Sequence, residues 1–151
     1  MVGRDGWCTE SEGDLVRNYA TVLETLSRGE GNIRTITSVT DRLPGKYLDV
    51  IPQNIILQDV DTPMIIDNEW RLTTDVEFGH CVLRALLLLL ASITRFGVPA
   101  NNRTYTRQEF IEEVFADSGY KISADDVTRY IALEADIQAQ ITGRLLSLIH
   151  I

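Results

Sequence analysis

Residues 49–57 read DVIPQNIIL, and residues 64–70 read MIIDNEW. Each stretch contains a short apolar run, and the turn-forming residues of 59–63 separate the two runs. Two short apolar runs joined by a turn predict a β-hairpin over 54–67, with its second strand ending at Asp67.

Apolar residues at helical spacing lie on both sides of the predicted hairpin. Residues 14–27 are expected to form an amphipathic helix that ends at Gly29 and Gly31. Residues 78–95 are expected to form a buried core helix, and the alternating residues 33–39 a strand or an extended linker. The apolar stripe of the first helix consists of Leu15, Tyr19, Val22, Leu23 and Leu26.

Two further helices are expected towards the C-terminus. Thr106 and Glu109 have the spacing of a capping box, which predicts a helix that ends at Ser118 and Gly119. The last helix begins near Ser123, and its thin apolar stripe is interrupted by Glu134. Such a stripe can pack on a neighbouring chain or begin a coiled coil. The stripe consists of Val127, Tyr130, Ile131, Ile137 and Ile141.

These elements predict an α+β fold that is mostly helical. We divide the chain into a ragged N-terminal lead (1–13), a main unit (14–100), a C-terminal helical segment (101–143) and a tail (144–151). The tail is apolar without a helix stop signal, and 146–151 resemble adapter read-through at the end of an environmental gene fragment. We therefore expect a non-native tail on a fragment of a longer protein.

The charge of the chain excludes some classes of partner. It has 22 acidic and 14 basic residues, a net charge of -8, and a hydrophobic fraction of 44%. A nucleic-acid surface needs clustered Lys and Arg, so we expect no nucleic-acid partner. The most apolar stretch, 81–93, contains Arg84 and is too short to span a bilayer.

Cys8 and Cys81 have no metal-ligand spacing, which favours free thiols and a cytoplasmic location.

Three residues around the hairpin carry the predicted chemistry. Asp49 precedes the amide of Asn54 by five residues, and the second carboxylate, Asp67, follows the hairpin. Groups on two adjacent loops can converge, and carboxylate and carbonyl oxygens suit Mg²⁺. A carboxylate that does not bind the metal can accept a proton from an attacking hydroxyl.

This arrangement resembles the C-lobe of protein-kinase-like folds, and most closely their aminoglycoside-phosphotransferase branch. The resemblance covers about residues 14–97. It implies that Asp49 is the catalytic base, and that Asn54 and Asp67 bind Mg²⁺ and thereby the phosphates of ATP. Glu69 would assist the metal, and Trp70 would pack against the core.

A narrower resemblance extends over more of the chain, to bacterial surface-polysaccharide proteins in which methyltransferase, kinase-like and glycosyltransferase modules are linked. The O-antigen chain terminators are of this kind. The residues that carry it, besides 49–54, are Leu43-Pro44-Gly45, Asp67-Asn68-Glu69-Trp70, Arg84-Ala85-Leu86 and Leu133-Glu134-Ala135 with Gln138.

The chain also departs from the kinase-like pattern. Tyr47 stands where these loops usually have His, and neither a glycine-rich phosphate loop nor a strand Lys precedes the first helix. We expect an ATP- and Mg²⁺-dependent phosphotransferase module that acts on a glycan hydroxyl but is inactive alone. The alternatives are a degenerate, non-catalytic scaffold, or a parent whose chemistry lies wholly outside this segment.

Two residues of the core helix are expected to be structural. Arg84 should be a buried ion-pair partner, since an unpaired buried charge is very costly, and Asp67 or Glu69 are the partners we predict. His80 should support the core. The last helix is the predicted surface for self-association through a coiled coil.

Overall fold

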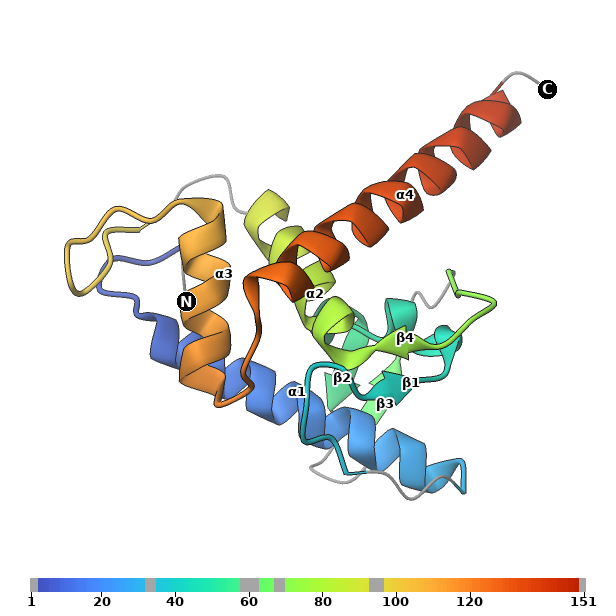
Figure 1. The fold of residues 1–151 in the computed structure, drawn as a ribbon, viewed down its shortest axis with the longest axis horizontal. Helices are drawn as coiled ribbons and strands as arrows, with labels where there is room; N and C mark the ends of the chain where they lie inside the picture. The colour runs from blue at the N-terminus through green and yellow to red at the C-terminus, as the bar shows by residue number, and fades with distance from the viewer. Residues whose placement is uncertain (1–2, 32–34, 58–62, 67–69, 93–96, 150–151) are drawn as a thin grey trace.

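The fold is that of a computed structural model, which describes residues 3–31, 35–57, 63–66, 70–92 and 97–149. These residues form a mostly helical α+β fold, which confirms the predicted class (Figure 1). The helices are α1 (Thr9–Gly29), α2 (Phe78–Ser92), α3 (Arg107–Ser118) and α4 (Ala124–Ile149). The strands are β1 (Arg42–Leu43), β2 (Ile55–Leu57), β3 (Pro63–Ile65) and β4 (Val76–Glu77), and the 3₁₀ helices are η1 (Gly45–Asp49) and η2 (Pro52–Asn54).

The predicted hairpin is confirmed. β2 and β3 pair antiparallel, with Ile55 opposite Ile65. The N–H of Ile66 donates to the carbonyl of Asn54 at 2.8 Å, which extends the ladder beyond the assigned strands. Asp67, the predicted end of the second strand, lies outside the described residues. Asn54 is therefore at the base of the hairpin, next to the point where β3 ends.

A second two-stranded sheet was not predicted. β1 and β4 pair antiparallel, with Arg42 opposite Glu77. Of the strand or linker expected over 33–39, the described part forms no strand. Val39, at its end, accepts a hydrogen bond from the N–H of Gly79 in the first turn of α2, at 2.8 Å. Two residues further on, the carbonyl of Asp41 accepts one from the N–H of Phe78, also at 2.8 Å. These carbonyls satisfy donors that the first turn of a helix cannot pair internally.

The N-terminal residues belong to the folded body, although a lead was predicted over 1–13. Trp7 is only 7% exposed, and its Nε1 donates to the carbonyl of Gly97 at 2.7 Å. α1 begins at Thr9 rather than at Asp14. Trp7 and the first turn of α1 therefore pack with the rest of the described chain.

α1 and α3 pack at a close crossing. A Cβ built on Gly13 of α1 would lie 2.8 Å from the carbonyl carbon of Asp117 on α3, so the crossing requires glycine. Thr9 donates a hydrogen bond to the Asp117 carboxylate, and Arg17 Nη1 donates to the Asp117 carbonyl at 2.6 Å.

The predicted capping box at the start of α3 is confirmed, since Glu109 N donates to Thr106 Oγ1 at 3.1 Å and Thr106 N donates to Glu109 Oε2 at 3.2 Å.

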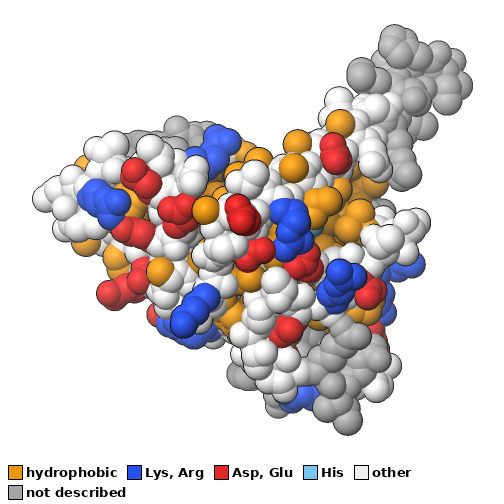
Figure 2. Space-filling view, viewed as in Figure 1, with side chains coloured by type: hydrophobic (Ala, Val, Ile, Leu, Met, Phe, Trp, Pro, Cys, Tyr) orange, Lys and Arg blue, Asp and Glu red, His pale blue; other side chains and the backbone are white. Residues whose placement is uncertain are grey.

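α4 packs against α2, and its stripe joins the same core as the rest of the chain. Val127, Tyr130 and Ile137 are buried as predicted, whereas Ile131 is 44% exposed. Residues 101–143 therefore do not form a segment with a core of their own. Beyond α2, α4 projects away from the body (Figure 1), and Figure 2 shows apolar side chains gathered near its base.

Candidate functional site

Asp49, the predicted catalytic base, ends η1 with its side chain turned into the core. It is 4% exposed. Its Oδ1 accepts a hydrogen bond from Arg84 Nη2 at 3.1 Å, and its Oδ2 accepts one from the N–H of Trp70 at 2.9 Å. Both oxygens of the carboxylate therefore bind groups of the protein itself.

Arg84 of α2 connects Asp49 to the last helix. Its Nη1 donates to Oε1 of Glu134 on α4 at 2.5 Å, and its side chain is 5% exposed. We predicted Arg84 as a buried ion-pair partner, and this is confirmed. Its described partners are Asp49 and Glu134, whereas we predicted Asp67 or Glu69, which lie outside the described residues. A single arginine thus donates a charged hydrogen bond to each of the two buried carboxylates.

The second oxygen of Glu134 contacts His80. His80 Nε2 lies 3.0 Å from Glu134 Oε2, and Gln138 Nε2 donates to Glu134 Oε1 at 2.9 Å. Burial alone would raise the pKa of Glu134, but the hydrogen bonds of His80 and Gln138 and the charge of Arg84 outweigh it and lower the pKa. We call Asp49, Arg84, Glu134 and His80 the buried ion network. Its members come from η1, α2 and α4.

Asn54 lies beside this network. Its Nδ2 donates to the main-chain carbonyl of Asp49 at 3.0 Å, which connects the end of η2 to the end of η1. Of the two predicted magnesium ligands, Asn54 is described and Asp67 is not. Within the described residues, no group of three or more His, Cys, Asp or Glu side chains is placed to hold a metal ion.

The geometry limits what Asp49 can do in this conformation. A general base must come within about 2.6–3.2 Å of the proton that it removes. The oxygens of Asp49 are at such distances from Arg84 and from the main chain of Trp70. The carboxylate therefore joins η1, α2 and the segment after the hairpin.

No protein-family model, curated protein or solved structure matches the chain. Among the helices described, none combines the length and the apolarity that crossing a bilayer requires.

Sequence reasoning missed Glu134 as a member of the site. It was read as an interruption of the apolar stripe of α4, yet it is 5% exposed and faces the core between Tyr130 and Ile137. The sequence does contain a signal for this pair. Glu134 is the one carboxylate on the apolar stripe of α4, and Arg84 is the one arginine in the apolar stretch that forms α2, so the two could have been predicted as partners. Both are charges that would be very costly to bury apart.

Proposed function

We propose that the chain is a non-catalytic scaffold or linker module of a larger surface-polysaccharide protein, and that it holds α4 at a fixed orientation. This proposal rests on the hydrogen bonds that the buried carboxylate of Asp49 accepts from Arg84 and from the main chain of Trp70. The residue that a kinase-like enzyme would use as its base is 4% exposed and accepts hydrogen bonds on both oxygens.

The buried ion network gives the scaffold its physical basis. It joins η1, α2 and α4 through charged hydrogen bonds that have strict geometric requirements. α4 has 26 residues, which corresponds to about 39 Å of helix at 1.5 Å per residue. A small rotation of α4 where it packs on α2 would displace its far end considerably. The hydrogen bonds of Glu134 would limit this rotation, because they require a defined geometry.

Hydrogen exchange of α4 tests the scaffold proposal. Asp49→Asn removes the charge that Arg84 faces but preserves the shape of the side chain. We expect the amides of α4 near Glu134 to exchange faster in this variant and the urea midpoint to fall. Asp136→Asn, at an exposed position of the same helix, is the matched control and should change neither. Unchanged protection of α4 in Asp49→Asn would contradict the proposal.

A phosphotransferase is the second candidate, and the order of elements after Asp49 favours it. Asn54 follows at the end of η2, and the antiparallel pair β2–β3 comes next. This is the order that the kinase-like resemblance implies. In this function Asn54 and Asp67 would bind Mg²⁺, which neutralises the charge on the ATP phosphates, and Asp49 would orient the hydroxyl of a glycan.

Nucleotide binding distinguishes the two candidates. The phosphotransferase predicts that ATP with Mg²⁺ raises the melting temperature of the protein. The shift should need both components, vanish in Asp67→Asn and persist in the exposed control Asp75→Asn. The scaffold predicts no shift that depends on Mg²⁺ and on Asp67.

A further inference from the structure

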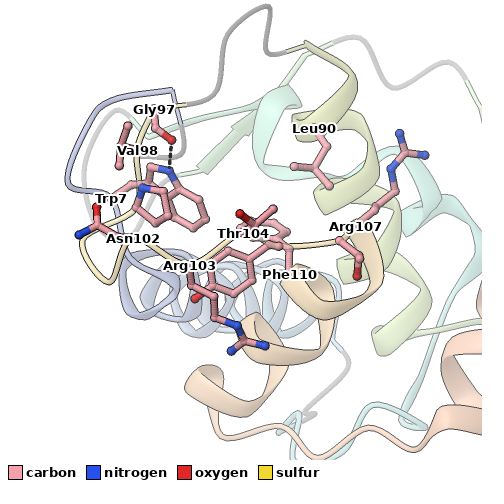
Figure 3. A pocket seen from close by; sticks show the side chains of 12 residues that line it. Trp7, Leu90, Gly97, Val98, Asn102, Arg103, Thr104, Arg107 and Phe110 are labelled. Atoms are coloured by element: carbon pink, nitrogen blue, oxygen red, sulfur yellow. Dashed lines mark hydrogen bonds between the residues drawn. The ribbon is translucent and has the colours of Figure 1, made fainter.

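A cavity of about 590 Å³ lies at the other end of α2, away from the buried ion network. It is formed by the last turns of α2, the segment 97–106 and the beginning of α3, with Trp7 on one side. Figure 3 shows Trp7 and Leu90 on opposite sides of the cavity. Pockets that bind small molecules have volumes of about 300–1,000 Å³. None of the four residues of the buried ion network lines it, so it is a separate feature of the fold.

One wall of the cavity is aromatic and rigid. The ring of Trp7 lies 5.4 Å from that of Tyr105 and 5.8 Å from that of Phe110, the latter edge to face at 73°. The hydrogen bond from Trp7 Nε1 to Gly97 fixes the indole, and Asn101 Nδ2 donates to the Tyr105 hydroxyl at 2.8 Å. Trp7 and Phe110 are buried and Tyr105 is partly exposed. Because the three rings are held in place, the part of the cavity wall that they line is preformed for another planar ring.

The charge of the lining is opposite to that of the chain. The chain has a net charge of -8, yet the described residues that line the cavity include Arg103 and Arg107 and no Asp or Glu. Arg103 is already engaged, because it lies over the Tyr105 ring at 4.9 Å and forms ion pairs with Glu113 and Glu109.

Arg107 is different from Arg103. It is exposed on the first turn of α3, and it forms no hydrogen bond or ion pair with any residue that the structure describes. In Figure 3 it lies across the cavity from Trp7. Among the residues that the structure describes, the cavity thus combines an apolar, aromatic wall with a cation at its edge, Arg107, that none of them pairs.

We propose that this cavity binds a small molecule with a planar aromatic ring and a single anionic group, such as an aromatic carboxylate or sulfonate. The ring lies against the aromatic wall that Trp7, Tyr105 and Phe110 line, and the anion pairs with Arg107. This site is independent of the scaffold function, because it shares no residue with the buried ion network.

Two related dyes test the proposal on the whole chain. The first is 8-anilinonaphthalene-1-sulfonate, an aromatic anion with a planar naphthalene ring, and the second is N-phenyl-1-naphthylamine, which has the same rings without the sulfonate. We expect saturable binding of both by fluorescence titration. In a ¹H–¹⁵N spectrum, the indole N–H signal of Trp7 should shift on addition of the sulfonate dye, while that of Trp70 stays in place.

Three variants locate the site and assign the charge. Arg107→Gln should weaken the sulfonate dye about tenfold, as loss of a hydrogen bond to a charged group predicts, and should leave the neutral dye unchanged. Arg71→Gln, at an exposed position outside the cavity, should affect neither dye. Thr104→Trp, at an exposed position of the lining, should fill the cavity and block both.

Three results would overturn the proposal. One is a shift of the Trp70 indole signal without one of Trp7, which would place the dye elsewhere. Another is an equal loss of affinity for the sulfonate dye in Arg107→Gln and Arg71→Gln, which would show that only the overall charge of the protein matters. The third is the absence of saturable binding to the folded wild-type chain.

Discussion

Gly79, in the first turn of α2, lies directly against the ring of Tyr130 on α4. A Cβ built on Gly79 would be 2.7 Å from Tyr130 Cε2 and 2.7 Å from the Cβ of Val39. Tyr130 is fully buried, and its hydroxyl donates to the carbonyl of Val39 at 3.1 Å. The beginning of α2, the segment before β1 and the first half of α4 therefore meet at a position where only glycine fits.

The first prediction concerns this contact. Gly79→Ala should lower the free energy of unfolding by about 1–3 kcal/mol, because a methyl group forced into a packed core displaces its neighbours. Gly29→Ala, at the last residue of α1 with open space around the position, is the matched control. It should be neutral or stabilising by up to about 1 kcal/mol. Urea unfolding measures both, and equal effects would contradict the close contact.

The second prediction concerns Arg84. Arg84→Met should destabilise the protein by about 3–5 kcal/mol, since it leaves the carboxylates of Asp49 and Glu134 buried without their cation. Arg103→Gln removes a guanidinium whose ion pairs are half-exposed and should change stability by about 1 kcal/mol or less. Urea midpoints at constant slope measure both values. A loss in Arg84→Met no larger than in Arg103→Gln would show that the network contributes no stability.

The third prediction is a dependence on pH through Glu134. Its pKa in the folded protein lies below the ordinary value of 4.5, so the folded state binds that proton less readily than the unfolded state. The stability from this group is present above about pH 4.5 and is lost as the pH falls through the folded pKa. Glu134→Gln should therefore be less stable than the wild type at pH 7, and the difference should narrow in acid.

Urea unfolding between pH 7 and pH 3 measures this effect. The control is Glu10→Gln, at an exposed carboxylate in the first turn of α1, which should change stability little at any pH. A difference between Glu134→Gln and the wild type that stays constant from pH 7 to pH 3 would exclude Glu134 from the acid response.

The fourth prediction concerns the two thiols. Burial raises the pKa of Cys81 to about 12, whereas a hydrogen bond with Ser11 lowers the pKa of Cys8, whose side chain is partly exposed. Because the thiolate is the reactive form, native protein should react rapidly with a thiol reagent at Cys8 alone. Mass spectrometry after iodoacetamide treatment should show one modification in native protein and two in guanidinium chloride. Rapid modification of native Cys8→Ser would contradict the burial of Cys81.

The local elements could be predicted because their signals are local. The apolar runs on either side of 59–63 predicted the hairpin, and the spacing of Thr106 and Glu109 predicted the cap of α3. β1 and β4 have two residues each, too few for a periodic pattern, so this sheet could not be predicted. Trp7 is a single aromatic residue in a polar segment, and only its contacts with Gly97 and Phe110 show that it is structural.

The candidate site could be predicted only in part, because its contacts are long-range. Asp49 was selected for its spacing to Asn54, and the two residues are indeed in contact. Its other partners, Trp70 and Arg84, are 21 and 35 residues away in the sequence. No local pattern encodes such pairings. The burial that makes them necessary depends on how α2 and α4 pack, which the sequence pattern does not specify.

The spacing of the buried ion network along the chain has a consequence for how the protein folds. Arg84 is separated from Asp49 by 35 positions and from Glu134 by 50. Closing loops of this length requires entropy to be lost before any contact is gained, which slows folding. Until α4 docks, the part of Arg84 that faces Glu134 has no carboxylate partner on α4 and stays open to water. We therefore expect docking of α4 to exclude water from the Arg84–Glu134 pair.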